Sequence, residues 1–382
     1  MDQEQYSSLM ELFAAMPDPR QARGKRYAWS LILTLIAAAL VSGARGVRAL
    51  SQWSAERQAE LLALLGGSRR RLPGATTVRR ALRAVDVADL EARARALGGP
   101  LAPVAPAAGG PPPLVGVALD GKQVNGANAH GAQVHLLSLT RHADACVLRQ
   151  RAVAAKTNEI PTAPHLLAGL DLTNVVVTMD ALLTQHAIAT RIRQQHGHYL
   201  LVVKDNQPTL AADIALAFDG HCPVVPGDYF ATATTVDKQH GRLETRTLDR
   251  TAALNDYLTW PGVGQVLRRT CHSVILKTGR VRHEVSYAIT SLPVATTTPA
   301  QLEALWRGHW SIENQVHYVR DVTCGEDVGQ VGVGNAPEAL AILRNLLLTV
   351  LRRHGWTNIA DALRHYGAYA PRALTLLGAL PA

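Results

Sequence analysis

The chain has 382 residues, of which 47% are hydrophobic, so it can bury the core of one large or two modest domains, and wholesale disorder is excluded. Lys and Arg number 39 against 30 Asp and Glu, and this net charge of +9 favours a polyanionic partner. The longest apolar run, 31–42, is shorter than the roughly 20 residues that a membrane-spanning helix needs. The four cysteines form no C-x-x-C pair, which indicates a reduced, cytoplasmic protein.

The first part of the chain predicts helices, because apolar residues recur there every three and four positions. The predicted helices cover 9–16, 29–42, 47–65 and 77–90. Residues 1–113 carry 15 Lys and Arg against 9 Asp and Glu. We therefore expect 1–96 to form a helical, DNA-binding domain. The stretch 97–113 is rich in Pro, Gly and Ala and carries no charge, which is typical of a linker.

The middle of the chain predicts an α/β core with the element order β-β-β-α-β-α-β-α. The predicted strands are 114–119, 134–140, 147–154, 175–179 and 199–203, and the predicted helices are 161–170, 185–195 and 209–218. The runs 175–177 and 200–203 are continuously apolar, as in strands buried on both faces. Residues 220–291 lose helical periodicity and gain Thr, Val and Tyr, which predicts a β-rich insertion.

Helical periodicity returns at Thr298, where Thr298-Pro299-Ala300-Gln301 has the pattern of a capping box with proline at the first helical position. One stripe of this helix is unusual for a solvated face. It would carry Trp306, Trp310, Glu313, His317 and Arg320 at steps of four and three. Further helices are expected over 336–354 and 358–365.

Three carboxylates occupy useful positions in this frame. Asp120 and Asp180 follow apolar strand segments, and Glu313 lies midway along the helix that begins after Thr298. Taken alone, each has an ordinary explanation, since Asp is common in turns and Glu on helix surfaces. Together, in this order, they are what binding of two divalent cations needs, because carboxylate oxygens suit Mg²⁺ or Mn²⁺.

Short motifs in a shared order run almost the whole length of the chain. They are Asp18-Pro19-Arg20, Asp120-Gly121-Lys122, Asn158-Glu159-Ile160-Pro161, Val177-Thr178-Met179-Asp180, Lys204-Asp205-Asn206-Gln207, Gly241-Arg242-Leu243-Glu244-Thr245-Arg246, Trp260-Pro261-Gly262, His309-Trp310-Ser311-Ile312-Glu313-Asn314, Glu326-Asp327 and Asn335-Ala336-Pro337-Glu338. In these motifs the chain resembles the H-repeat-associated family of insertion-sequence DDE transposases, within the retroviral-integrase-like, ribonuclease H-fold group. The chain departs from the family pattern at Asp205, where Gly is more usual, and at Cys324-Gly325, where an aromatic-basic pair is common.

The resemblance implies a ribonuclease H-like mixed-sheet core with a β-rich insertion, preceded by the helical domain. The core would comprise 114–219 and 292–335, the insertion 220–291 and the C-terminal helices 336–382. It further implies that Asp120, Asp180 and Glu313 are the catalytic, metal-binding triad. The activity would be Mg²⁺-dependent cutting of element ends and joining of the 3′-OH to target DNA, with two Mg²⁺ or Mn²⁺ ions.

Six further residues are candidates for DNA contact, although plain surface charge is the alternative for each. They are Arg320, Lys122, Lys204, Arg242, Arg246 and His309. The expected partners are the terminal repeats of the element, target DNA and further copies of this chain in a homodimer or higher oligomer, with no membrane and no nucleotide cofactor. We expect a bacterial cytoplasmic protein that is nucleoid-associated when it is on DNA. A metal-dependent nuclease of the same fold and a catalytically inactive DNA-binding descendant remain alternatives.

Overall fold

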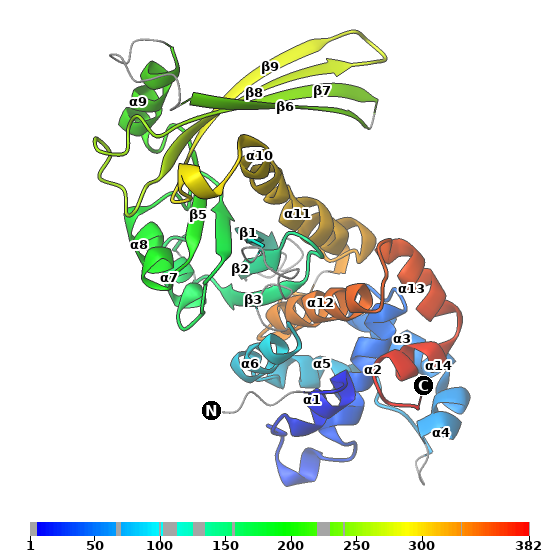
Figure 1. Cartoon of the computed structure of the whole chain (residues 1–382). Coiled ribbons are helices and arrows are strands. Elements are labelled where there is room, and N and C mark those ends of the chain that lie inside the picture. The colour runs from blue at the N-terminus through cyan, green and yellow to red at the C-terminus, as the bar shows by residue number, and fades with distance from the viewer. Residues whose placement is uncertain are drawn as a thin grey trace.

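The computed structural model describes residues 6–65, 70–98, 101, 113–124, 134–154, 157–219, 230–239, 241–329 and 331–381. Figure 1 shows a helical body at one end, a sheet with flanking helices in the middle, and a group of long strands that project at the other end. No helix in the described part of the chain is long and apolar enough to cross a membrane.

The N-terminal region is helical, as predicted, but two of the predicted helices are each divided. The helices are α1 (Leu9–Ala15), α2 (Trp29–Val41), α3 (Val47–Glu56), α4 (Gln58–Leu65), α5 (Ala75–Ala84) and α6 (Val87–Gly98). The single helix predicted over 77–90 is wrong because Asp86 begins a new one. Its carboxylate accepts hydrogen bonds from the backbone N–H groups of Ala88 and Asp89 at 3.0 and 3.1 Å, which is how a helix amino terminus is capped.

One sheet of nine strands runs through the described residues, in the order β3-β2-β1-β4-β5-β9-β8-β7-β6. Its first five strands are β1 (Val115–Val124), β2 (Val134–Arg141), β3 (Val147–Ala152), β4 (Val175–Met179) and β5 (His198–Val203). β1, β2 and β3 pair antiparallel, whereas β4 and β5 run parallel to β1. This is the strand order of a ribonuclease H-like core and confirms the predicted fold class.

The β-rich insertion continues the core sheet. Its strands are β6 (Phe230–Gln239), β7 (Arg242–Thr251), β8 (Gln265–Ile275) and β9 (Val281–Thr290). β9 pairs antiparallel with β5, from Leu200 opposite Thr290 to Val203 opposite Tyr287. The insertion therefore closes back on the exposed edge of β5, and Figure 1 shows its far ends projecting beyond the core.

The two faces of the core sheet are covered by different helices. The helices α7 (Thr162–Leu167), α8 (His186–Gln194) and α9 (Pro208–Phe218) share a hydrophobic core with Val117 and Leu119 of β1. Ala118, between these two residues, faces the opposite side and belongs to a core that includes Ile312 and Val316. Alternation along the strand thus directs residues 118 and 120 toward the segment that carries Glu313.

That segment begins as predicted and then changes its winding. The capping box at Thr298 is present, and α10 (Pro299–Gly308) and α11 (Trp310–Ile312) follow it. From Glu313 to His317 and from Val319 to Thr323 the hydrogen bonding is of the wider π type. A π turn holds more residues than an α turn, so residues spaced three and four apart no longer lie on one face. The predicted stripe from Trp306 to Arg320 is therefore wrong. Trp306, His317 and Arg320 are buried, whereas Trp310 is 57% exposed.

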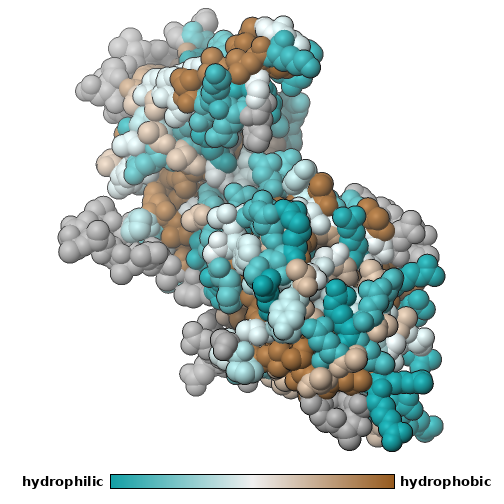
Figure 2. All heavy atoms as spheres, turned by 90° about the vertical axis from the view of Figure 1, so that its right-hand side faces the viewer, coloured by the Kyte–Doolittle hydropathy of each residue, from teal (hydrophilic) through white to brown (hydrophobic). Residues whose placement is uncertain are grey.

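The N-terminal and C-terminal helices form one helical body. α12 (Ala336–Arg353), α13 (Ile359–Ala368) and α14 (Ala370–Leu376) contribute buried side chains to the same core as α1, α2, α3 and α5. In Figure 1 the blue and red helices lie together, and on the face shown in Figure 2 this lower region carries mostly hydrophilic side chains around a smaller hydrophobic area. Most of the predicted linker, 97–113, lies outside the described residues.

Candidate active site

Asp120 and Asp180 lie side by side on neighbouring parallel strands. Leu119 of β1 is paired with Met179 of β4, so the next residue on each strand is one of the two aspartates. β1 continues to Val124. The prediction that Asp120 ends its strand is therefore wrong. Asp120 lies within β1, at the point where the parallel pairing with β4 ends. This is the carboxyl edge of the parallel strands, where open α/β sheets bind ligands.

Glu313 reaches the same edge from the covering helix. It directly follows α11, which packs against β1, and its side chain is exposed. The structure thus brings the three predicted carboxylates together. Their proximity has an electrostatic consequence, because burial first, and then the charges of Asp180, Glu159 and Glu313, raise the pKa of Asp120 to about 7. Burial also raises the pKa of Asp180.

The composition of this edge fits a divalent cation. Its donors are carboxylate oxygens, which Mg²⁺ and Mn²⁺ prefer. The buried ring of His317 lies beside them, with Nδ1 3.5 Å from an Asp120 oxygen, and its Nε2 has no hydrogen-bond partner among the residues that the structure describes. Burial lowers the pKa of His317 to about 3, so this contact joins a neutral ring to the carboxylate. In the described part of the chain, no three Asp, Glu, His or Cys side chains are close enough together to hold a metal ion.

A fourth carboxylate, Glu159, lies at this edge and was assigned no role from the sequence. It is buried, and one of its oxygens is 2.7 Å from Nε2 of His135. Its charge acts on both Asp120 and Asp180. The sequence signal that could have pointed to Glu159 is its place in the Asn158–Pro161 motif, just before a predicted helix. Its side chain lies against Gly121, on the face of β1 that α7 covers, whereas Asp120 points to the opposite face.

A chain of hydrogen bonds fastens the Glu313 segment to the sheet. Oγ1 of Thr178 on β4 lies 2.9 Å from Nε2 of His142 and 3.1 Å from Nδ1 of His309. The His142 ring leaves no room for a Cβ at Gly116 of β1 or at Gly308 of α10, since either would fall within 2.3 Å of its Nδ1. The predicted DNA ligand His309 is therefore engaged inside the protein. Through its contact with Thr178, His309 ties the segment that carries Glu313 to β4.

This chain predicts a loss of stability in mild acid. Burial lowers the pKa of His142 to about 3 and that of His309 to about 4, below the value of about 6.5 in an unfolded chain. Both rings therefore contribute stability above about pH 6.5, which is lost as the pH falls toward their folded values. We expect the midpoint of thermal unfolding to fall between pH 7.5 and 5.5 more steeply in the wild type than in His142→Gln. An equal slope would show that His142 titrates normally. His283→Gln, at an exposed position on β9, is the control.

Three of the predicted DNA-contacting cations are held by acidic partners. Arg320 is fully buried, and its guanidinium bonds Glu326 at 2.5 Å, so the prediction that it contacts phosphate is wrong for this structure. The π turns rotate it from the stripe of Glu313 into the core. Lys122 is buried and 2.5 Å from Asp321, and Arg246 pairs with Asp237 at 2.7 Å and with Glu244.

The remaining candidates are exposed. Lys204 follows β5 and its charge acts on Asp180. Arg242 begins β7 and has a long contact of 3.9 Å with Glu244. Trp310, three residues before Glu313, is an exposed aromatic side chain at the same edge. Lys204 and Trp310 thus form a basic and aromatic rim beside the carboxylates, whereas Arg242 lies at the projecting hairpin end of the insertion.

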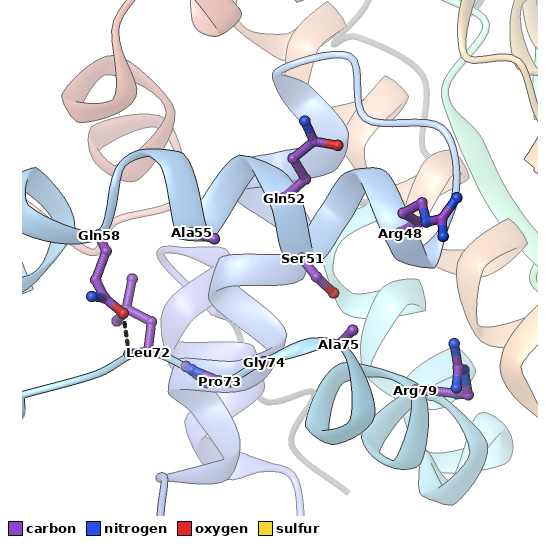
Figure 3. Close-up of a pocket in the computed structure, with 10 residues that line it drawn as sticks. All are labelled: Arg48, Ser51, Gln52, Ala55, Gln58, Leu72, Pro73, Gly74, Ala75 and Arg79. Atoms are coloured by element: carbon purple, nitrogen blue, oxygen red, sulfur yellow. Dashed lines mark hydrogen bonds between the residues drawn. The ribbon is translucent and has the colours of Figure 1, made fainter.

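A groove of about 500 Å³ lies in the helical body, between α3 and the segment that leads into α5. Its polar lining, as far as the structure describes the chain, comprises Arg48, Ser51, Gln52, Gln58 and Arg79 and contains no acidic residue. In Figure 3 the two arginines stand at the same end, one on each wall, and Gln58 at the other end accepts a hydrogen bond from the backbone of Leu72 at 3.4 Å. The groove is thus basic at one end and neutral at the other.

Comparison with known families gives two matches. Residues 10–97 match the family described as DDE_Tnp_1-associated, and residues 111–347 match the Transposase DDE domain. The first match covers the N-terminal helices, and the second extends from the start of the core into α12.

Comparison with known proteins points the same way. The chain is 28% identical over 366 residues to "Putative transposase YncI" of Escherichia coli O157:H7, covering 90% of this chain and 87% of that protein. It is 30% identical over 250 residues to "H repeat-associated putative transposase YhhI" of Escherichia coli K12, covering 62% of this chain and 63% of that one. Among solved structures, it is similar to a piggyBac transposase synaptic complex with hairpin DNA, with a TM-score of 0.45 and 10% identity over 97% of this chain and 80% of that chain.

Proposed function

Since this chain belongs to the DDE transposase family, whose domain it matches over residues 111–347, we propose that it cuts the ends of an insertion sequence and joins them to target DNA with Asp120, Asp180 and Glu313. The observation that carries this proposal is the register of β1 and β4. It places two aspartates next to each other, on the sheet face that the Glu313 segment covers.

Asp120, Asp180 and Glu313 would together hold two divalent ions through their carboxylate oxygens. When bound, such ions activate an attacking oxygen and stabilise the leaving oxygen of an in-line displacement. A water molecule would attack the phosphodiester at the element end, and the bond to the 3′ oxygen would break. The freed 3′-OH would then attack a target phosphodiester, and the 3′ oxygen of the target strand would leave. The protein itself contributes position and charge, and no covalent intermediate is needed.

DNA would lie across the rim of the site and along the helical body. Lys204 and Arg242 are exposed and available to phosphates, and Trp310 offers an aromatic face to an unpaired base. The α3–α5 groove supports DNA binding by the predicted domain 1–96, because Arg48 and Arg79 line it and its described lining residues include no acidic side chain. Synapsis of two element ends would be the task of a homodimer or higher oligomer.

Strand cleavage on DNA that carries the gene's own flanking sequence tests the proposal. We expect nicks at the element ends with Mg²⁺ or Mn²⁺ and none with Ca²⁺ or a chelator, followed by joined products when target DNA is added. Cutting without joining would instead indicate a nuclease of the same fold. Binding without metal-dependent cutting would indicate an inactive descendant.

Binding of Mg²⁺ should stabilise the folded protein. The repulsion that raises the pKa of Asp120 is relieved when a cation binds among the carboxylates, and a ligand of the folded state shifts the unfolding equilibrium. We expect millimolar Mg²⁺ to raise the midpoint of thermal unfolding of the wild type and to leave Asp120→Asn/Asp180→Asn unchanged. An equal rise in both proteins would place the stabilising ion elsewhere.

A further inference from the structure

We propose that α5 is the helix with which this protein reads the sequence of the element ends, and that its exposed face lies in the major groove of the duplex. The inference rests on the proposed function, which supplies the duplex. It goes beyond that function because it assigns the recognition of base pairs to Thr76, Arg80 and Arg83. It predicts a change in sequence preference that can be measured without metal and without cleavage.

α5 presents one continuous basic stripe to solvent. The four members of the stripe are exposed and stand at positions i, i+3, i+4 and i+7, which are neighbours on one face of an α-helix. They are Thr76, Arg79, Arg80 and Arg83. The sequence from 61 to 85, which includes α5, contains six arginines and no acidic residue. The charge of this surface fits a polyanion.

The guanidinium groups of the stripe are not used within the described part of the protein, where none of the three has an ion-pair or hydrogen-bond partner. Asp86, which follows α5, uses its carboxylate to cap α6, and Glu56 on α3 is bonded by Gln52 at 2.8 Å. Arg246 and Arg320, by contrast, are held by acidic partners. The α5 stripe therefore remains available to an external anion.

Contacts at both ends fix the direction of α5. The segment that leads into it is held at Leu72, whose backbone N–H donates a hydrogen bond to Gln58 and whose carbonyl accepts one of 3.2 Å from the hydroxyl of Tyr27. At the far end, the side-chain amide of Asn335 donates a hydrogen bond of 2.9 Å to the carbonyl of Val85. Between these points the inner face of α5 is buried in the core of the helical body. The stripe is thus presented on a rigid element, as precise recognition requires.

The α3–α5 groove runs along one edge of the stripe and fits a backbone phosphate. Arg79 lines one wall and Arg48 the other, and Figure 3 shows the two side chains at the same end. The first turn of α5 also lines the groove at Gly74 and Ala75, and no side chain caps it. Guanidinium groups and helix amino termini both bind phosphate oxygens. We therefore assign Arg48 and Arg79 to a phosphate of the same duplex.

The rest of the stripe has the size and chemistry for base pairs. The major groove of B-DNA is about 12 Å wide and admits an α-helix. From Thr76 to Arg83 the stripe extends about 10 Å along the helix axis, which corresponds to about three base pairs. In the major groove, Arg donates two hydrogen bonds to O6 and N7 of guanine, and Thr contacts a base edge or the methyl group of thymine. Arg80 and Arg83 would therefore select G·C pairs.

Binding of two labelled duplexes by the full chain, with EDTA present so that neither is cut, tests this inference. One duplex carries the gene's own flanking sequence and the other has the same bases in scrambled order. We expect Arg80→Ala and Arg83→Ala each to lower the preference for the end duplex about 10- to 100-fold, the effect of losing one bidentate base contact. Arg48→Ala should weaken binding of both duplexes by the same factor and reduce the slope of log affinity against log salt by about one.

Arg353→Ala is the matched control, because it removes an exposed arginine at the end of α12 and should change neither affinity nor preference. Equal losses on both duplexes in Arg80→Ala and Arg83→Ala, unchanged binding in both variants, or a wild type without preference would each overturn the reading of sequence by α5. The proposed function would still stand if the wild type cuts end DNA with Mg²⁺. Lost preference in the two variants beside a wild type that cuts no DNA would instead overturn the proposed function and keep the role of α5.

Discussion

Glu313→Gln should abolish metal-dependent strand cleavage, with a loss of at least about a thousandfold, comparable to removing a strong electrostatic stabiliser of a transition state. The amide keeps the size and polarity of the side chain but removes the negative charge that would hold an ion opposite Asp120. The side chain is exposed, so folding should not change. Binding of duplex DNA should persist, because the exposed cations of the rim and the groove are untouched. Cleavage of labelled end DNA and binding by fluorescence anisotropy measure the two effects separately.

A matched control is Glu284→Gln, which neutralises an exposed glutamate on β9 and should cleave normally. Near-normal cleavage by Glu313→Gln would mean that another acid is the third ligand. Glu326 is a poor replacement because it is buried between Arg320 and Arg344. Asp321, whose second oxygen has no hydrogen-bond partner within the described part of the chain, would be the next residue to replace.

Glu326→Ala should destabilise the protein by about 3–5 kcal/mol, the range for breaking a buried ion pair from one side. The glutamate bonds Arg320 at 2.5 Å and Arg344 at 3.1 Å, and all three side chains are buried. Burial alone would raise the pKa of Glu326, but the two guanidinium groups outweigh it and lower that pKa. Removing the carboxylate leaves two buried positive charges without a partner. Equilibrium unfolding in urea measures the loss.

The same network joins the segment that carries Glu313 to the helical body, because Arg344 also donates a hydrogen bond of 2.8 Å to the carbonyl of Arg45. Replacing all three charged residues together by apolar ones should cost much less than Glu326→Ala, since no charge is then left unpaired. A loss below about 1 kcal/mol in Glu326→Ala would show that water reaches the two arginines.

Local signals in the sequence determined most of the elements and the three carboxylates. Continuous apolar runs predicted β4 and β5, three-and-four spacing predicted the N-terminal helices, and the capping box at Thr298 marked the start of α10 correctly. These signals act over a few residues, because hydrogen bonds and side-chain alternation are set by neighbours along the chain. The shared order of short motifs along most of the chain, those of Asp120, Asp180 and Glu313 among them, identified the family.

Contacts between distant segments decided what those signals could not. Pairing of β9 with β5 made the insertion part of the core sheet. The charge surplus of residues 1–113 and the uncharged linker predicted a tethered module, yet its helices share a core with α12 and α14, so deleting 1–113 would expose that core. The hydrophobic effect has no direction, so the apolar spacing of a helix predicts that one face is buried but not which other segment covers that face.

The site shows the same division. The sequence predicted which carboxylates belong together, but the winding of the Glu313 segment and the surroundings of each cation depend on tertiary packing. The π turns moved Arg320 from the predicted DNA-facing stripe into a buried pair with Glu326. The register of β1 and β4 brought Asp120 next to Asp180, which lies sixty residues away in the sequence. Residue identity thus determined the chemistry available to this protein, and the fold decided which charges meet, because Coulomb interactions depend on distance and burial rather than on position in the chain.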